Sequence, residues 1–373
     1  MTDVHGDVWA RGARFDHAVN VATGGPPDWL RALLRRELDE DALTAYPDER
    51  AAAEAIAFRH GRAPEEVVLL NGAAHGFALL AQVLAPRRPA VVHPQFTEPE
   101  RVLGDAVERI VLSDPYALEG AVVGKDIDLI VVGNPTNPTG VLHPRAAIRG
   151  LAGAGRTVVV DEAFMDFVAG EPETLAGEGV AGGEGGASDT GGVGGDSGAS
   201  DTGGVGGEGG ASDTGVVVLR SLTKILAVPG LRVGYLLAEA ALAEQLRAAR
   251  SAWPVNGLAL AVARAAALHP ERLVPVAERA ARDRAALGAK LAAQLPAARV
   301  HPGAANFLLV ALPPDGPDAL TSAARLREAH GIAIRPASTF PGLGTHHVRL
   351  TPRGGEQDAR LVAALRATVA EGR

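Results

Sequence analysis

The sequence contains no cysteine. Disulfide bonds, thiolate metal ligands and a cysteine nucleophile are therefore excluded together, and we predict no metal site. It also lacks an apolar run long enough to cross a bilayer, and its N-terminal stretch, MTDVHGDVWARGARFDH, lacks the apolar core of a secretion signal. The sequence has no excess of basic residues either, since its formal net charge is −8. We therefore expect a cytoplasmic globular protein that binds neither nucleic acid nor a membrane.

Short apolar runs alternate with helical stretches along the chain. The runs are Val67–Leu70, Ala90–His93, Leu129–Gly133, Thr157–Glu162, Val216–Leu219 and Val233–Leu237. Continuous Val, Ile and Leu runs separated by helices predict an α/β fold with a mostly parallel sheet covered by helices on both faces. Helices are expected at Asp28–Leu38 and Glu49–His60, whereas residues 1–25 are expected to be irregular.

A chain of 373 residues is long for one compact unit, so two domains are expected. We assign 41–255 to a large domain and 256–373 to a smaller α+β domain, against which the N-terminal segment 1–40 packs. Within the large domain, 170–215 is rich in Gly, Ser, Asp and Thr and repeats Ala-Ser-Asp-Thr. Such a composition cannot bury enough apolar surface to fold, so we predict a disordered surface insertion there. The cleft between the domains is the expected ligand site.

The stretch VVVLRSLTKILAVPGLRVGY, from Val216 to Tyr235, places Lys224 directly after a buried strand. An amine at the end of an apolar strand is poorly solvated, and desolvation with nearby cations lowers a lysine pKa, as imine formation requires. A lone lysine after a strand is more often a solvated loop residue. Here Ser221 and Arg232 flank it at short spacing, so Lys224 is the first candidate catalytic residue.

Three more polar motifs follow predicted strands. Small residues at 71–76 (NGAAHG) open a helix whose backbone N–H groups could bind a phosphate, although small residues also occur where a helix packs closely on a sheet. The turn NPTNPTG at 134–140 contains two Asn-Pro pairs, which are costly unless the turn itself is needed. Asp161 ends a buried strand, where a carboxylate needs a cationic partner.

The ordered set Asn137, Asp161, Ser221, Lys224 and Arg232 resembles the signature of fold type I pyridoxal-phosphate (PLP) enzymes, the aspartate-aminotransferase superfamily. This resemblance implies a large PLP-binding domain with a mostly parallel, doubly covered sheet and a smaller α+β domain. It also implies pyridoxal 5'-phosphate as the cofactor, with Lys224 holding it covalently. Ser221 and Arg232 then bind its phosphate.

The same resemblance implies roles for residues in the other motifs. Asp161 pairs with the protonated pyridine nitrogen, and Asn137 donates to the phenolic oxygen of the cofactor. The backbone N–H groups of Ala73 and Ala74 become phosphate donors, and Phe96 stacks on the pyridine ring. On its own, a phenylalanine at this point is more often a core residue.

Four further residues match positions that face the substrate or a second subunit. Tyr46 corresponds to a tyrosine that reaches the cofactor phosphate of the neighbouring subunit, which implies a homodimer. Arg349 resembles the arginine that holds a substrate α-carboxylate as a bidentate pair. Arg335 and Asn20 stand where relatives that act on phosphorylated substrates contact them. Taken singly, each of these arginines would more often be a surface residue.

The stretches DEAFMDF, SLTK…PGLR and the early Asn20…GGPP are similar to those of the cobalamin-pathway threonine-phosphate decarboxylases, close relatives of the histidinol-phosphate aminotransferases. This implies an enzyme that converts a small phosphorylated amino acid, L-threonine O-3-phosphate, to (R)-1-amino-2-propanol O-2-phosphate and carbon dioxide. The sequence does not give which bond at Cα stands perpendicular to the ring, so transamination of the histidinol-phosphate type stays open. A non-catalytic PLP-binding or regulatory protein is the third alternative, but it should have lost Lys224 or Asp161.

Overall fold

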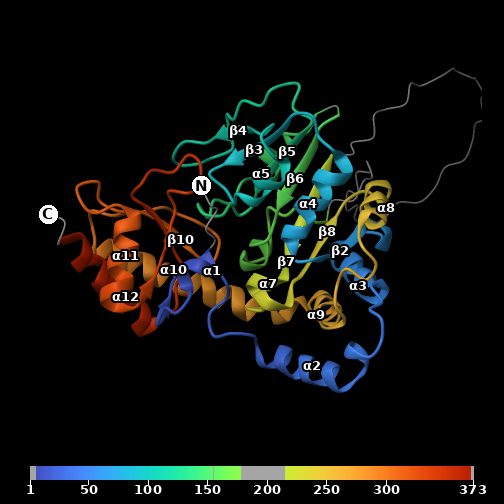
Figure 1. Ribbon diagram of the computed structural model, residues 1–373, viewed down its shortest axis with the longest axis horizontal. Coiled ribbons are helices and arrows are strands. Elements are labelled where there is room, and N and C mark those ends of the chain that lie inside the picture. The colour runs from blue at the N-terminus through green and yellow to red at the C-terminus, as the bar shows by residue number, and fades with distance from the viewer. Residues whose placement is uncertain (1–5, 154, 178–214, 371–373) are drawn as a thin grey trace, which may run out of the picture.

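The computed structural model describes residues 6–153, 155–177 and 215–370, which form an α/β fold built around a seven-stranded sheet (Figure 1). Its strands are β2 (Val67–Asn71), β3 (Pro89–His93), β4 (Glu108–Val111), β5 (Leu129–Gly133), β6 (Thr157–Asp161), β7 (Val216–Ser221) and β8 (Val233–Leu237). They lie in the order β2-β8-β7-β6-β5-β3-β4, and β8 is antiparallel to both of its neighbours while every other neighbouring pair is parallel. The predicted mostly parallel sheet is confirmed. The sequence reading missed β4, an edge strand whose residues are mostly exposed and therefore carry no apolar run.

Helices cover both faces of this sheet, which is why its strands are apolar at consecutive positions. The helices of the described chain are α1 (Gly6–Ala10), α2 (Asp28–Asp39), α3 (Arg50–His60), α4 (Ala73–Leu84), α5 (Glu98–Leu103), α6 (Arg145–Arg149), α7 (Leu222–Ile225), α8 (Ala240–Ala249), α9 (Gly257–Leu268), α10 (Val274–Gln294), α11 (Ala319–His330) and α12 (Gly355–Ala370). Val68 and Leu70 of β2 share a core with α4 and α8, whereas Val67 and Leu69 share a core with α3 and α9. Alternate residues of one strand thus belong to opposite layers.

The parallel strands of this sheet all end on the same side of it, and the polar motifs gather at this carboxyl-end edge. Because β5 and β6 are parallel, their register places Gly133, which precedes the Asn-Pro turn, opposite Asp161. The antiparallel β8 begins at the same edge, since Val233 pairs with Asn71 at the end of β2. Arg232, directly before β8, is therefore brought to the edge at which the parallel strands finish.

A second core lies around a four-stranded antiparallel sheet near the C-terminus (Figure 1). Its strands, in the order β12-β13-β10-β9, are β12 (Arg335–Pro336), β13 (His347–Leu350), β10 (Leu308–Ala311) and β9 (Arg299–Val300). The stretch 1–25, expected to be irregular, contains α1 and β1 (Phe15–Asp16), and β1 pairs in parallel with β11 (Ile332–Ala333). The division into domains at 255 and 256 stays a prediction, and α9 just beyond that boundary packs in the core of the large sheet.

The predicted disordered insertion needs correction at its start. Residues 170–177 are part of the fold, and Leu175 is fully buried. Glu171 forms an ion pair with Arg220, a completely buried side chain of β7. This segment looks like a linker in composition, but a buried cation holds it in place. The part of the prediction that covers 178–214 lies outside the described residues.

Over the described ranges, no helix is both long and apolar enough to span a membrane.

Candidate active site

A cavity of about 400 Å³ lies where the edge of the seven-stranded sheet meets the four-stranded sheet. Every predicted site residue except Tyr46 lines it, namely Asn20, Ala73, Ala74, Phe96, Asn137, Asp161, Ser221, Lys224, Arg232, Arg335 and Arg349. These residues come from the N-terminal segment, from the strand ends of the large sheet and from β12 and β13. The fold therefore brings into one cavity nearly all of the side chains that the sequence motifs singled out.

One corner of the cavity is built to hold an anion. Gly72, directly before α4, has φ +79°, and a Cβ at this position would lie 2.2 Å from Nη2 of Arg232. The missing side chain thus lets the guanidinium approach the first turn of α4. Opposite them, Ser221 Oγ and Thr223 Oγ1 lie 2.8 Å apart. Backbone N–H groups at the N-terminus of α4, two hydroxyls and a guanidinium together suit a phosphate.

Lys224 and Asp161 have pKa values shifted toward each other. Burial lowers the pKa of Lys224 to about 8; Asp161 opposes this fall, and Arg232 and Arg349 add to it. Burial likewise raises the pKa of Asp161 to about 6, against the stabilising effect of the Ala163 N–H, which donates to Oδ1 at 3.1 Å. An amine of this kind is available as a nucleophile near neutral pH. The buried carboxylate is suited to a cationic partner such as a protonated ring nitrogen.

Arg335 and Arg349 are direct partners across β12 and β13. Both side chains are buried, and burial together with the charge of Arg335 lowers the pKa of Arg349 to about 9. Like charges placed opposite each other destabilise a sheet unless an anion compensates them. Arg349 donates to Asn137 Oδ1 at 2.6 Å and to Ala18 O at 2.7 Å, while its Nε has no hydrogen-bond partner. The pair therefore suits a second anion, and the contact of Arg349 with Asn137 Oδ1 leaves the Nδ2 of that residue to act as a donor.

Residues that sequence reasoning did not single out complete the walls, among them the carboxylates Asp7 and Glu98. They also include Val19, Val21, Thr97, Thr223 and Phe340. Only Thr223 had a sequence signal, since its hydroxyl directly precedes the lysine. Phe164 also lines the cavity and packs edge-on against Phe307 at 5.0 Å between ring centroids. Phe164 brings no hydroxyl to this wall of the cavity.

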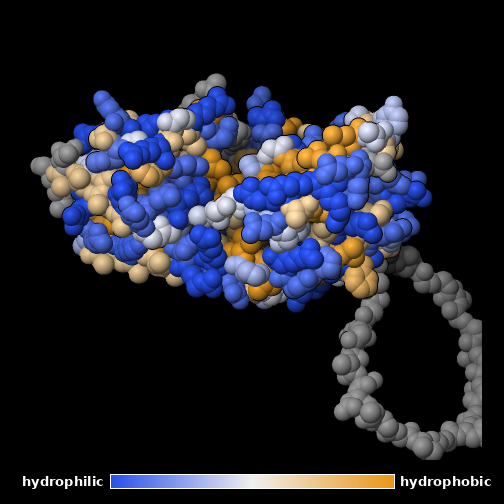
Figure 2. Space-filling model, turned by 90° about the horizontal axis from the view of Figure 1, so that it is seen from below, coloured by the Kyte–Doolittle hydropathy of each residue, from blue (hydrophilic) through white to orange (hydrophobic). Residues whose placement is uncertain are grey.

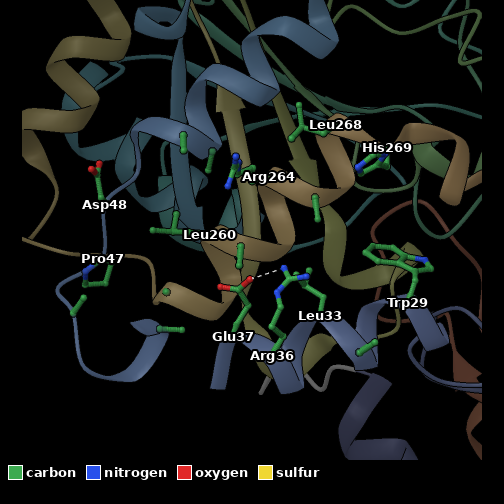
Figure 3. Close-up of a pocket in the computed structure, with 18 of the residues that line it drawn as sticks. Trp29, Leu33, Arg36, Glu37, Pro47, Asp48, Leu260, Arg264, Leu268 and His269 are labelled. Atoms are coloured by element: carbon green, nitrogen blue, oxygen red, sulfur yellow. Dashed lines mark hydrogen bonds and ion pairs between the residues drawn. The ribbon is translucent and has the colours of Figure 1, made fainter. Parts of the chain in front are cut away.

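Tyr46 lies outside this cavity. It is 77% exposed and stacks on Trp253 with 4.4 Å between ring centroids. It lines a separate hollow of about 920 Å³ between α2 and α9, whose walls include Trp29, Leu33 and Leu260 (Figure 3). Apolar side chains are exposed among hydrophilic ones on the face seen from below (Figure 2). The predicted contact of Tyr46 with the cofactor of a neighbouring subunit stays a prediction.

The residues of the cavity fit PLP. Lys224 is placed to hold the aldehyde carbon, the corner at Arg232 suits the phosphate, and Asp161 suits the pyridine nitrogen. Fold and site together define a PLP-dependent enzyme of fold type I. The family model for aminotransferase class I and II matches residues 18–366, and the chain belongs to this family.

Known relatives carry two different names. The chain is 39% identical over 360 residues to a histidinol-phosphate aminotransferase of Mycobacterium tuberculosis, covering 94% of this chain and 86% of that protein. It is 30% identical over 368 residues to the threonine-phosphate decarboxylase of Salmonella typhimurium, covering 94% and 90%. The solved histidinol-phosphate aminotransferase of Sinorhizobium meliloti in complex with PLP has the same fold, with a TM-score of 0.80 at 19% identity, and the match covers 99% of this chain and 95% of that one. The protein is therefore a PLP-dependent enzyme of the class I and II family.

Substituting Gly72 should weaken cofactor binding. Gly72→Ala places a Cβ against the Arg232 guanidinium, so we expect the affinity for PLP to fall at least about tenfold, measured by titrating the PLP-free protein and following the bound-cofactor absorbance. Gly61→Ala is the matched control, because Gly61 also has positive φ (+63°) but no atom lies within 4 Å of its added Cβ. That control should lose about 1–2 kcal/mol of stability and keep its PLP affinity. Equal PLP affinity in the two variants would contradict the assigned phosphate corner.

The low pKa of Lys224 can be measured directly, because the sequence has only the lysines Lys125, Lys224 and Lys290. Only a neutral amine reacts with an amine-directed label, so labelling of Lys224 in the PLP-free protein should be half-maximal near pH 8, read by mass spectrometry of its peptide. Asp161→Asn should move this midpoint lower, since the carboxylate of Asp161 opposes the fall. A midpoint near the ordinary lysine value of about 10.4 would show that burial does not activate this amine.

Proposed function

We propose that the enzyme decarboxylates L-threonine O-3-phosphate to (R)-1-amino-2-propanol O-2-phosphate and carbon dioxide. The observation that carries this proposal is the pair of buried arginines, Arg335 and Arg349, opposite each other on a wall of the cavity that contains Lys224. The substrate carries a carboxylate on its amine-bearing carbon and a phosphate on the next carbon. Two neighbouring guanidinium groups match two neighbouring anions. Histidinol phosphate, by comparison, carries one anionic group.

Each group in the cavity then has a defined task. PLP supplies a ring that withdraws electrons from the substrate Cα when it is bound. Asp161 holds a proton at the ring nitrogen, and its burial makes this pairing favourable. Lys224 would hold the cofactor, and its amine is placed to return a proton to the substrate Cα. The amide of Asn137, oriented by Arg349, donates to the cofactor oxygen.

The two arginines decide which bond at Cα is cleaved. Only the bond that stands perpendicular to the ring overlaps its π system, so the orientation of the substrate selects the reaction. Arg349 holds the carboxylate, and Arg335, whose guanidinium lies over the Phe340 ring at 5.1 Å, holds the phosphate. Fixing both anions places the bond to the carboxylate for cleavage rather than the bond to hydrogen.

Transamination of histidinol phosphate is the second candidate. The observation that favours it is the relative named for that reaction, which at 39% is more similar to this chain than the decarboxylase at 30%. In that case Arg335 and Arg349 would share one phosphate, and Lys224 would remove the proton from Cα.

Turnover of the PLP-loaded protein distinguishes the two reactions. With L-threonine O-3-phosphate and no oxo acid, we expect carbon dioxide release with the cofactor spectrum regained at the end. Arg349→Lys should lower kcat/KM by about 100-fold, because an ammonium group cannot form the bidentate pair. The control Arg282→Lys, on the exposed side of α10, should leave it unchanged. Conversion to the pyridoxamine form by histidinol phosphate, without carbon dioxide from threonine phosphate, would reject the decarboxylase.

We also propose that the enzyme is a homodimer in which Tyr46 reaches the cofactor phosphate of the other subunit. Support comes from the exposed position of Tyr46 at a hollow whose walls include the apolar side chains Trp29, Leu33 and Leu260 as well as charged ones. Tyr46→Phe keeps the ring that stacks on Trp253 and removes the hydroxyl. We therefore expect a dimer in sedimentation analysis with PLP affinity reduced about tenfold. A wild-type protein that is fully active as a monomer would refute this arrangement.

A further inference from the structure

Arg353, just after β13, binds the backbone of the N-terminal segment 16–22 in several places at once. Its Nε donates to Asp16 O, its Nη2 to Val19 O, and its Nη1 to Val21 O at 3.1 Å. The side chain is only 10% exposed. A planar guanidinium presents its donors in a fixed fork, so one side chain constrains three peptide groups of this segment relative to each other.

The backbone at Arg353 is fixed by Asp358 of α12. The backbone N–H of Arg353 donates to Asp358 Oδ1 at 2.7 Å, and the N–H of Gly354 donates to Oδ2 at 3.0 Å. Asp358 is buried in the C-terminal core. Segment 16–22 also has an internal hydrogen bond, in which Asp16 Oδ1 accepts from the Ala18 N–H at 2.8 Å. Asp358 therefore fixes the backbone from which the Arg353 side chain extends, and the segment that this side chain contacts is itself ordered by a hydrogen bond of Asp16.

Segment 16–22 connects the two groups on which the proposed reaction depends. Ala18 O accepts from Arg349 Nη2 at 2.7 Å, and the Ala22 N–H donates to the backbone oxygen of Lys224 at 2.9 Å. Residues 19–21, between these contacts, line the cavity. One short stretch therefore contacts a side chain of the four-stranded sheet and the main chain of the catalytic lysine.

We propose that Arg353 is a positioning residue that acts through segment 16–22 and sets the position of the Arg349 guanidinium relative to Lys224. Arg353 is not one of the cavity-lining residues, so its effect on the substrate is indirect. Without the Arg353 side chain, three carbonyl groups of segment 16–22 lose their hydrogen-bond donor, and this part of the cavity wall becomes more mobile. The consequence for turnover rests on the proposed function, in which Arg349 binds an anion of the substrate.

The chain offers a matched control in Arg156, which also donates to three backbone carbonyls. Its partners are Ile127 O at 2.9 Å, Leu151 O at 2.8 Å and Gly124 O at 2.7 Å. It precedes the start of β6, at the opposite end of that strand from the cavity. Replacing it removes the same kind of interaction from a place with no contact to the substrate.

The test compares Arg353→Lys, Arg353→Met and Arg156→Lys with wild type, in the full chain loaded with PLP. Amide hydrogen exchange of segment 16–22 should become about tenfold faster in Arg353→Lys and faster still in Arg353→Met, because the segment opens more readily. KM for L-threonine O-3-phosphate should rise about tenfold in Arg353→Lys while PLP is retained, since Arg349 loses its placement. Arg156→Lys should match wild type in both measurements.

Two results would overturn the inference. One is exchange of segment 16–22 at the wild-type rate in both Arg353 variants. The other is a rise in KM that is as large in Arg156→Lys as in Arg353→Lys. If wild type does not consume threonine phosphate, the proposed function fails separately, and the kinetic comparison is made with histidinol phosphate. If neither substrate is consumed, exchange alone decides: a faster rate confined to the Arg353 variants supports the inference, and equal rates in all variants reject it.

Discussion

The structure depends on an excess of positive charge held inside one cavity. Four cationic side chains line it (Lys224, Arg232, Arg335 and Arg349), against the three carboxylates of Asp7, Glu98 and Asp161. Burial lowers the pKa values of Lys224 and Arg349, and the repulsion from neighbouring guanidinium groups lowers them further. Such an arrangement costs free energy in the empty protein and is relieved when anions enter. A cofactor phosphate at one end and an anionic substrate at the other supply the missing charge.

Other buried charged residues near the cavity pair with one another and not with the groups that line it. Asp161 and Glu162 are adjacent in sequence, yet Glu162 turns away from the cavity and pairs with the buried Arg220 at 2.9 Å. Arg220 also binds Glu171, whose pKa burial alone would raise but which this guanidinium lowers to about 2. The members of this separate cluster thus have their ion-pair partners within the protein. Asp161 is therefore left for a partner that the chain does not provide.

Sequence reasoning worked for features that are set by neighbours along the chain. The strands of the large sheet were predicted because burial on both faces makes them apolar throughout. Asn137, Asp161 and Lys224 were singled out by motifs that end or follow these strands and resemble those of a known superfamily, and the structure brings the three into one cavity. The edge strand β4 was missed because it is largely exposed. The segment 170–177 was misread because its composition resembles a linker, and only the tertiary contact with Arg220 shows why it is ordered.

The residues that sequence reasoning could not find act across the whole length of the chain. Arg353 and the carbonyls of segment 16–22 are more than three hundred positions apart, so no local spacing could pair them. The same holds for the contact between Arg349 and Ala18. Single-sequence patterns report periodicity and local motifs, whereas these contacts arise only when the residues that follow β1 meet β13 and the residues after it.

Under the proposed function, the choice between the two reactions depends on that same long-range arrangement. The two relatives with different names cover nearly the same share of this chain, so the overall fold cannot separate decarboxylation from transamination. Both reactions need Lys224, Asp161 and a phosphate site, all of which belong to the large sheet. What can differ is where the anion-binding arginines of the small sheet stand relative to the lysine. Because segment 16–22 is the backbone that contacts both Arg349 and Lys224, small changes in how it is anchored can redirect the substrate without changing any group that takes part in the chemistry.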